Sequence, residues 1–172
     1  MFLQCVTNAV VKDVVIDKGA GGAPWGTAAI HLQLARNVRL ENVTVKNMPH
    51  TGVSDQCGID FEADVDTCSI INCTFENNAG AAIEFLANFD CCPEAVSRNV
   101  LIKGCRFINN NYMKMYENPS QILVQNWQKD NRPTGWIEDC TYINPEEVVF
   151  LGGDGHIDGF VTRNNNEITR DT

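Results

Sequence analysis

The 172-residue chain lacks the hallmarks of several protein classes. It has 13 Lys and Arg against 22 Asp and Glu, and this net charge of −9 argues against a nucleic-acid backbone or an anionic membrane as main partner. No apolar run approaches the roughly 20 residues of a membrane span, and residues 1–5 lack the basic and apolar regions of a signal peptide. The eight Cys include no CxxC pair. We therefore interpret most of them as buried, small apolar side chains.

One sequence pattern recurs through the chain. It appears in four clear copies and two weaker ones, at residues 36–47, 67–77, 99–109, 136–144, 10–18 and 156–164. In each copy, two short segments of alternating apolar and polar residues flank one residue of a type that tolerates a left-handed backbone. These bend residues are Asp13, Asn42, Asn72, Gly104, Asp139 and Gly159. The unit is therefore a strand, a one-residue bend and a second strand.

A third alternating segment follows each copy after a loop of variable length. These segments are residues 29–34, 58–62, 82–86, 121–125 and 148–151. Three short strands in about 30 residues predict an all-β fold, a right-handed single-stranded parallel β-helix of about five to six turns, in which stacked turns bury each other's apolar faces. An antiparallel sandwich would not place one bend residue at the same register in every repeat. The stacking also puts Cys73, Cys105 and Cys140 in one interior column.

The ends of the repeat array leave no room for a cap. The first copy begins within ten residues of Met1, whereas solenoids need polar caps because open sheet edges promote association. We therefore expect residues 1–172 to form a single β-helix domain that is an internal or C-terminal part of a larger β-helix protein. Alternatively, self-association or a partner chain covers the open ends.

The third strands contain the candidate catalytic and binding residues. If their Ile and Phe residues face the interior, alternation directs the intervening polar side chains outward. This outward set contains His31, Gln33, Asp60, Glu62, Glu84 and Gln125. Asp60 and Glu84 would be neighbours on strands ~4.8 Å apart, whereas Asp60 and Glu62 would be roughly 7 Å apart along one strand.

Carboxyl groups this close repel one another, so the pKa of one should rise and that group stays protonated near neutral pH. An acid beside an ionised carboxylate is what glycoside hydrolysis requires. The Asp60/Glu84 pair suits the ~5–5.5 Å separation of retaining enzymes, and the Asp60/Glu62 pair leans towards the ~6.5–9.5 Å of inverting ones. The alternative is that these charges only keep an exposed sheet soluble.

The loops beside these strands favour a binding site. Segments 18–28, 87–97, 110–120 and 126–135 are long, and walls beside one face make a cleft. They carry Trp25, Tyr116 and Trp127, whose flat rings suit the C–H faces of sugars. With His31, Gln33 and Gln125 these aromatic residues form the expected binding set for an oligo- or polysaccharide.

The repeats resemble the pectate-lyase-like right-handed β-helix superfamily. Within it, Gly58-Ile59-Asp60-Phe61-Glu62, followed one turn later by Ala82-Ile83-Glu84-Phe85, is similar to β-helix glycoside hydrolases of the β-xylosidase and fucosidase type. The resemblance implies that Asp60 is the nucleophile, Glu84 the acid/base and Glu62 a supporting group. It also implies an extracellular or cell-surface location.

Two alternatives stay open beside a hydrolase without cofactor or metal. One is a polysaccharide lyase assisted by Ca²⁺, which the three carboxylates could hold through hard oxygen ligands. No Lys or Arg projects from the third strands to act as its base, and Lys114, Lys129 and Arg132 are available only from loops. The other is a non-catalytic β-helix that binds glycans or serves as structure.

Overall fold

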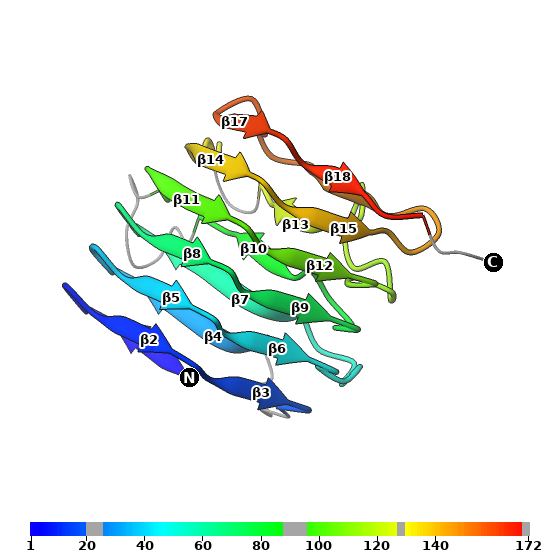
Figure 1. Cartoon of the computed structure of the whole chain (residues 1–172), viewed down its shortest axis with the longest axis horizontal. Coiled ribbons are helices and arrows are strands. Elements are labelled where there is room, and N and C mark those ends of the chain that lie inside the picture. The colour runs from blue at the N-terminus through cyan, green and yellow to red at the C-terminus, as the bar shows by residue number, and fades with distance from the viewer. Residues whose placement is uncertain (20–25, 88–95, 127–129, 170–172) are drawn as a thin grey trace.

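Eighteen short strands build the part of the chain that the structure describes. The structure is a computed structural model that describes residues 1–19, 26–87, 96–126 and 130–169. Within these ranges every regular element is a strand, and no helix is long and apolar enough to cross a membrane. The strands form three parallel six-stranded sheets that stack coil upon coil, with the two termini at opposite ends of the stack (Figure 1). The predicted all-β parallel β-helix of five to six turns is confirmed.

Each coil contributes one strand to each sheet. The first sheet contains β1 (Phe2–Gln4), β4 (Thr27–Gln33), β7 (Asp55–Ala63), β10 (Ile83–Phe85), β13 (Ser120–Val124) and β16 (Val149–Gly153). The second sheet contains β2 (Val10–Lys12), β5 (Arg39–Glu41), β8 (Ser69–Ile71), β11 (Val100–Lys103), β14 (Gly135–Glu138) and β17 (Phe160–Arg163). The third sheet contains β3 (Val15–Asp17), β6 (Thr44–Lys46), β9 (Thr74–Glu76), β12 (Arg106–Ile108), β15 (Thr141–Ile143) and β18 (Asn166–Glu167).

The bend between the second and third sheets lies where the repeats predicted it, with one exception. The φ angles of five predicted bend residues are positive, namely those of Asp13, Asn42, Asn72, Gly104 and Asp139. Gly159 is not the sixth; Asn164 holds that place with φ 51°, and its amide donates to Asp139 Oδ1. The sequence pattern of the weak last copy places the bend at Gly159. In the structure the neighbouring Phe160 packs into the interior, and this packing sets the register of the last coil.

Two further columns of left-handed residues mark the other corners of the coil. One contains Asn8, Asn37, Thr67 and Asn99, and the other contains Lys18, Asn47, Asn77 and Asn109. Side-chain amides in these columns donate from one coil to the previous one, as Asn37 does to Asn8 and Asn109 to Asn77. Asn tolerates the left-handed region and supplies both a donor and an acceptor. The ladders therefore explain why the chain is rich in Asn.

The interior is filled by side chains stacked in register. Phe61 and Phe85 lie parallel with ring centroids 4.7 Å apart, and Phe75 stacks on Phe107 at 5.3 Å. Fully burying such a side chain contributes about 1.5–3 kcal/mol. The predicted column of Cys73, Cys105 and Cys140 is also present, and all three are buried free thiols whose sulfurs contact backbone carbonyls.

The terminal coils present apolar side chains to solvent. Val10 and Val15 are exposed on the first coil, and Val161 and Ile168 on the last. Further coils or another chain would also cover interior residues of the terminal coils that are only partly buried, such as Val11, Ile16 and Leu151. That expectation stays a prediction, as does the assignment of the chain to a larger protein.

Candidate functional site

The first sheet is the irregular one. β7 is nine residues long, and its register with β4 shifts between Thr27 and Ala28 and between Leu32 and Gln33. β7 also begins with two consecutive left-handed residues, Asp55 at φ 65° and Gln56 at φ 52°. The left-handed region is unfavourable for a residue such as Gln56, and backbone strain concentrates at functional sites.

The outer face of this sheet gathers the predicted polar residues. Glu84 is paired with Asp60 in the ladder, His31 is paired with Asp60 on the other side, and the core residues Ile59 and Phe61 flank Asp60 on β7. The predicted register is confirmed. Asp60 and Glu84 therefore emerge side by side from successive coils, on the side of the sheet opposite to the core.

The expectation that this face is open to solvent is wrong at its centre. Asp60 is 4% exposed and Glu84 is 0% exposed, and Gln33 and Gln125 are also buried. Leu123 alternates with core residues and therefore lies outside the coil, where it packs with Cys57 and Ala81 in a second apolar cluster. Strand alternation predicts which way a side chain points, but it does not predict what covers it. His31 and Glu62 are only partly covered.

In each of the two paired carboxyl groups, one oxygen contacts a nitrogen of a neighbouring side chain. His31 Nδ1 lies 3.0 Å from Asp60 Oδ2, and Gln125 Nε2 donates to Glu84 Oε1. Phe2 covers one face of the imidazole, and the two rings stack with centroids 4.2 Å apart. Asp60 Oδ1, Glu84 Oε2 and His31 Nε2 are buried, and no N–H or hydroxyl group of the described residues donates to those two oxygens.

Asp55 is a member of the site that sequence reasoning missed. The Tyr116 hydroxyl donates to Asp55 Oδ1 at 2.8 Å and accepts from the Asp55 backbone N–H at 3.0 Å. A Cβ at Gly26 would lie 1.9 Å from the Asp55 carboxylate, and a Cβ at Gly80 would lie 1.8 Å from its carbonyl oxygen. Two glycines therefore make room for Asp55, a signal that is visible only once the coils are stacked.

Burial sets the protonation of this cluster. It raises the pKa of Asp60 to about 7, with the charge of Asp55 adding to the rise and a hydrogen bond with Glu62 opposing it. The pKa of Glu84 rises well above its ordinary value because the side chain is fully buried and faces the charges of Asp55 and Asp60. The pKa of Asp55 is also raised by burial, whereas burial lowers the pKa of His31 because it penalises the charged imidazolium.

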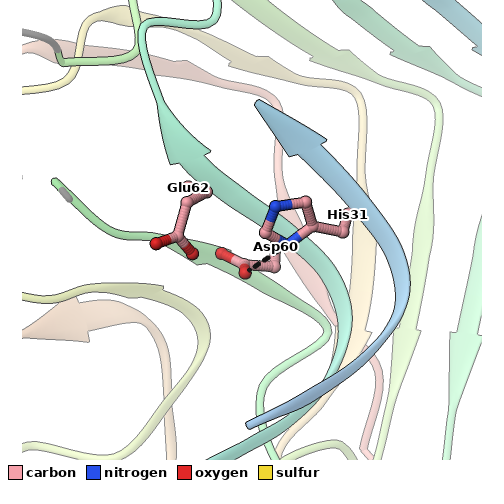
Figure 2. A group of neighbouring side chains, drawn as sticks. All are labelled: His31, Asp60 and Glu62. Atoms are coloured by element: carbon pink, nitrogen blue, oxygen red, sulfur yellow. Dashed lines mark hydrogen bonds and ion pairs between the residues drawn. The ribbon is translucent and has the colours of Figure 1, made fainter. Parts of the chain in front are cut away.

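Glu62 completes a second group on the same face (Figure 2). Nitrogen and carboxylate oxygens of His31, Asp60 and Glu62 all lie within 4.8 Å of one another. The Asp60 and Glu62 carboxyl groups are thus closer than the ~6.5–9.5 Å of an inverting pair. The expectation that this pair suits an inverting mechanism is therefore not supported. Their side chains turn towards each other along the strand.

The remaining predicted binding residues are scattered. Gln33 accepts a hydrogen bond from Gln4 at 2.8 Å, while Gln125 and Tyr116 join the carboxyl cluster as described. Trp25 and Trp127 lie outside the described residues, as do Lys129 and parts of three of the four long loops, so the predicted cleft stays a prediction. Lys114 is paired with Glu147, and Arg132 is paired with Asp130.

Fold and site together define a class: a parallel β-helix with a buried acidic cluster on the outer face of one sheet. Residues 1–126 match the family model described as a right-handed β-helix region, and the chain belongs to this family. Its coil fits the pectate-lyase-like superfamily. Membership is compatible with carbohydrate-active and with structural β-helix proteins. Neither the curated proteins nor the solved structures include a detectable match.

Proposed function

We propose that this protein is a glycoside hydrolase that acts on an oligo- or polysaccharide through Asp60 and Glu84. The supporting observation is the state of the two neighbouring carboxyl groups. Each has one oxygen held by a side chain and one buried oxygen for which the described residues offer no hydrogen-bond donor other than the cluster's own carboxyl groups. A pair of carboxyl groups whose environments separate their pKa values is the usual arrangement of an acid and a base in one site.

The two roles follow from the order of ionisation. The pKa of Asp60 rises to about 7, whereas Glu84 is wholly buried and beside two other carboxyl groups, which hold it protonated. Glu84 then donates its proton to the leaving oxygen of the glycosidic bond, while Asp60 Oδ1 attacks the anomeric carbon and forms a glycosyl–enzyme bond. Glu84, now a carboxylate, takes a proton from the water that breaks this bond.

Neighbouring residues would position the pair. His31 orients the Asp60 carboxylate through Oδ2, and Gln125 orients Glu84 through Oε1. Because Glu84 is fully buried, hydrolysis requires that the cover over the cluster opens for the sugar. A polysaccharide substrate also implies that the protein works outside the cell or at its surface.

The test is sugar release from a panel of neutral and uronate glycans, with and without chelator. We expect hydrolysis that chelator does not abolish. Asp60→Asn should remove activity on every substrate, whereas Glu84→Gln should spare aryl glycosides whose leaving group needs no protonation. Glu76→Gln, on the outer face of the third sheet, is the matched control and should retain full activity.

The other outcomes separate the alternatives. An unsaturated, absorbing product that depends on Ca²⁺ would identify a lyase, and glycan binding without turnover would identify a binding or structural β-helix. Full activity on the natural glycan in either Asp60→Asn or Glu84→Gln removes that residue from the mechanism.

A further inference from the structure

The outer face of the first sheet also has the ligands of a metal site. His31 on β4 and Asp60 and Glu62 on β7 converge from two adjacent strands, and their nitrogen and oxygen atoms lie within 4.8 Å of one another (Figure 2). Their positions are fixed by the ladder, because His31 is the direct partner of Asp60 and Glu62 follows two residues later on the same face.

Unpartnered buried atoms beside this group indicate that it holds a ligand. Asp60 is only 4% exposed, yet the described residues offer its Oδ1 no hydrogen-bond donor other than the cluster's own carboxyl groups, and they offer the buried His31 Nε2 no hydrogen-bond partner. Glu84, the next residue across the ladder and fully buried, also has an oxygen for which the described residues offer no donor other than the neighbouring carboxyl groups. Leaving a buried polar atom unsatisfied costs about 1–3 kcal/mol, and more for a charged group. Several such atoms side by side are explained by a cation that accepts their lone pairs.

We propose that His31, Asp60 and Glu62 bind one divalent transition-metal ion of the Zn²⁺ or Mn²⁺ class. One imidazole and two carboxylates match the ligands of such ions, whereas Ca²⁺ takes six to eight oxygen ligands and no nitrogen. Metal–ligand bonds of about 2.0–2.2 Å bring ligand atoms to about 3.3–3.6 Å from one another. The three side chains therefore need to move inward by roughly an ångström.

The residues that surround these three ligands support this assignment. Phe2 stacks on the imidazole with an interplanar angle of 11°, which limits rotation of the His31 ring. Glu84 is the direct neighbour of Asp60 across the ladder. Ring orientation and nearby carboxylates are the features that strengthen a metal–histidine bond.

The metal site does not require the proposed hydrolase, but it predicts a relation to it. A bound ion would occupy the Asp60 carboxylate, which is the proposed nucleophile. Added Mn²⁺ should therefore inhibit hydrolysis, and chelator should restore it.

The experiment is a titration of the whole chelator-treated chain with Mn²⁺, followed by electron paramagnetic resonance. Mn²⁺ is the probe because it disfavours thiolates, so the exposed Cys5 and the Cys column do not compete for it. We expect one ion per chain, and we expect His31→Gln and Glu62→Gln each to weaken binding at least tenfold. His156→Gln, which removes the histidine paired with Asp130, is the control and should bind as the parent chain does.

Circular dichroism of each variant separates lost binding from lost folding. Absence of a bound ion at millimolar Mn²⁺, or unchanged affinity in both His31→Gln and Glu62→Gln, overturns the metal site. Metal binding in a chain that releases no sugar from any glycan would support the site while removing the proposed hydrolase, so the two failures are distinguishable.

Discussion

The second and third sheets differ from the first sheet in a way that separates folding from chemistry. Strands of the second and third sheets are two to four residues long, pair without register shifts and place polar side chains in exposed ladders. The first sheet has strands of three to nine residues, a shifted register and buried carboxyl groups on its outer face. The regular repeats give every coil the same packing and hydrogen bonds, which serves folding. Departures from the repeat, as in the first sheet, are where residues are expected to serve function.

Removing a stacked ring from the interior should have the largest effect. Phe85 is fully buried between coils, where it stacks on Phe61 and contacts Phe160. We expect Phe85→Ala to lower the free energy of unfolding by about 3–5 kcal/mol, because the rigid coils cannot collapse into the cavity. Phe2→Ala, which truncates an exposed ring on the same sheet, should cost less than about 1 kcal/mol. Urea denaturation of both variants measures the difference, and equal losses would contradict the stacked interior.

Removing the buried hydrogen bonds of Asn78 should have the second-largest effect on stability. Asn78 donates to Val45 O at 3.2 Å and to Asn110 Oδ1 at 2.7 Å, and it accepts from the Met48 N–H at 3.1 Å. Asn78→Ala leaves these buried groups without partners, and we expect a loss of about 2–4 kcal/mol in urea denaturation. Asn78→Asp keeps the acceptor and should lose less than Asn78→Ala at a pH where the aspartate is protonated. A loss below 1 kcal/mol for Asn78→Ala would show that the corner is held by other contacts.

The pH dependence of stability should report the acidic cluster. The pKa of Asp60 is about 7 in the folded chain and 3.8 in its ordinary state, so between these values the folded state holds a proton that the unfolded state lacks. Stability should therefore fall as pH rises from 5 to 7, by on the order of 2 kcal/mol for this group. Asp55 and Glu84 act in the same direction, and His31, whose pKa is lowered, acts in the opposite one.

Asp60→Asn should flatten this slope in urea denaturation measured at pH 5, 6 and 7. Asp66 is the control, because hydrogen bonds from Asn99 lower its pKa and its contribution is lost only in stronger acid. Asp66→Asn should therefore keep the parent slope between pH 5 and 7. Parallel curves for Asp60→Asn and the parent chain would show that Asp60 ionises as freely in the folded state as in the unfolded one.

The sequence predicted the regular part of the molecule well. Recurring Asn and Asp residues and period-two alternation located the strands and five of six bends, because each coil repeats the same local physics. The adjacency of Asp60 and Glu84 on neighbouring strands followed from the same register. The sequence did not predict the burial of Asp60, because strand alternation gives the direction of a side chain and not what packs over it.

Asp55 was missed for a related reason. Its left-handed backbone is not shared by Thr27, its ladder partner in the previous coil, and its hydrogen-bond partner Tyr116 is 61 residues away along the chain. The contact between His31 and Asp60 likewise depends on side-chain rotamers, which alternation does not fix. Gly159 was assigned from residue type alone in the weakest copy, where the packing of Phe160 decides the register.

The smallest effect tests the exposed bends that the repeats share. Asn42 adopts φ 51° and donates to Asp13 Oδ1 at 2.7 Å on the exposed side of the coil. Asn42→Ala should cost about 1–2 kcal/mol, because a Cβ is unfavourable in the left-handed region and Ala has no amide to stabilise it. Asn42→Gly loses the same hydrogen bond but not the conformation, so its cost should be lower by about 1 kcal/mol. Gly104, at φ 64° in the same column, shows that the coil accepts this residue. If both variants lose equal stability in urea denaturation, the amide ladder and not the backbone angle explains why Asn occupies the bend.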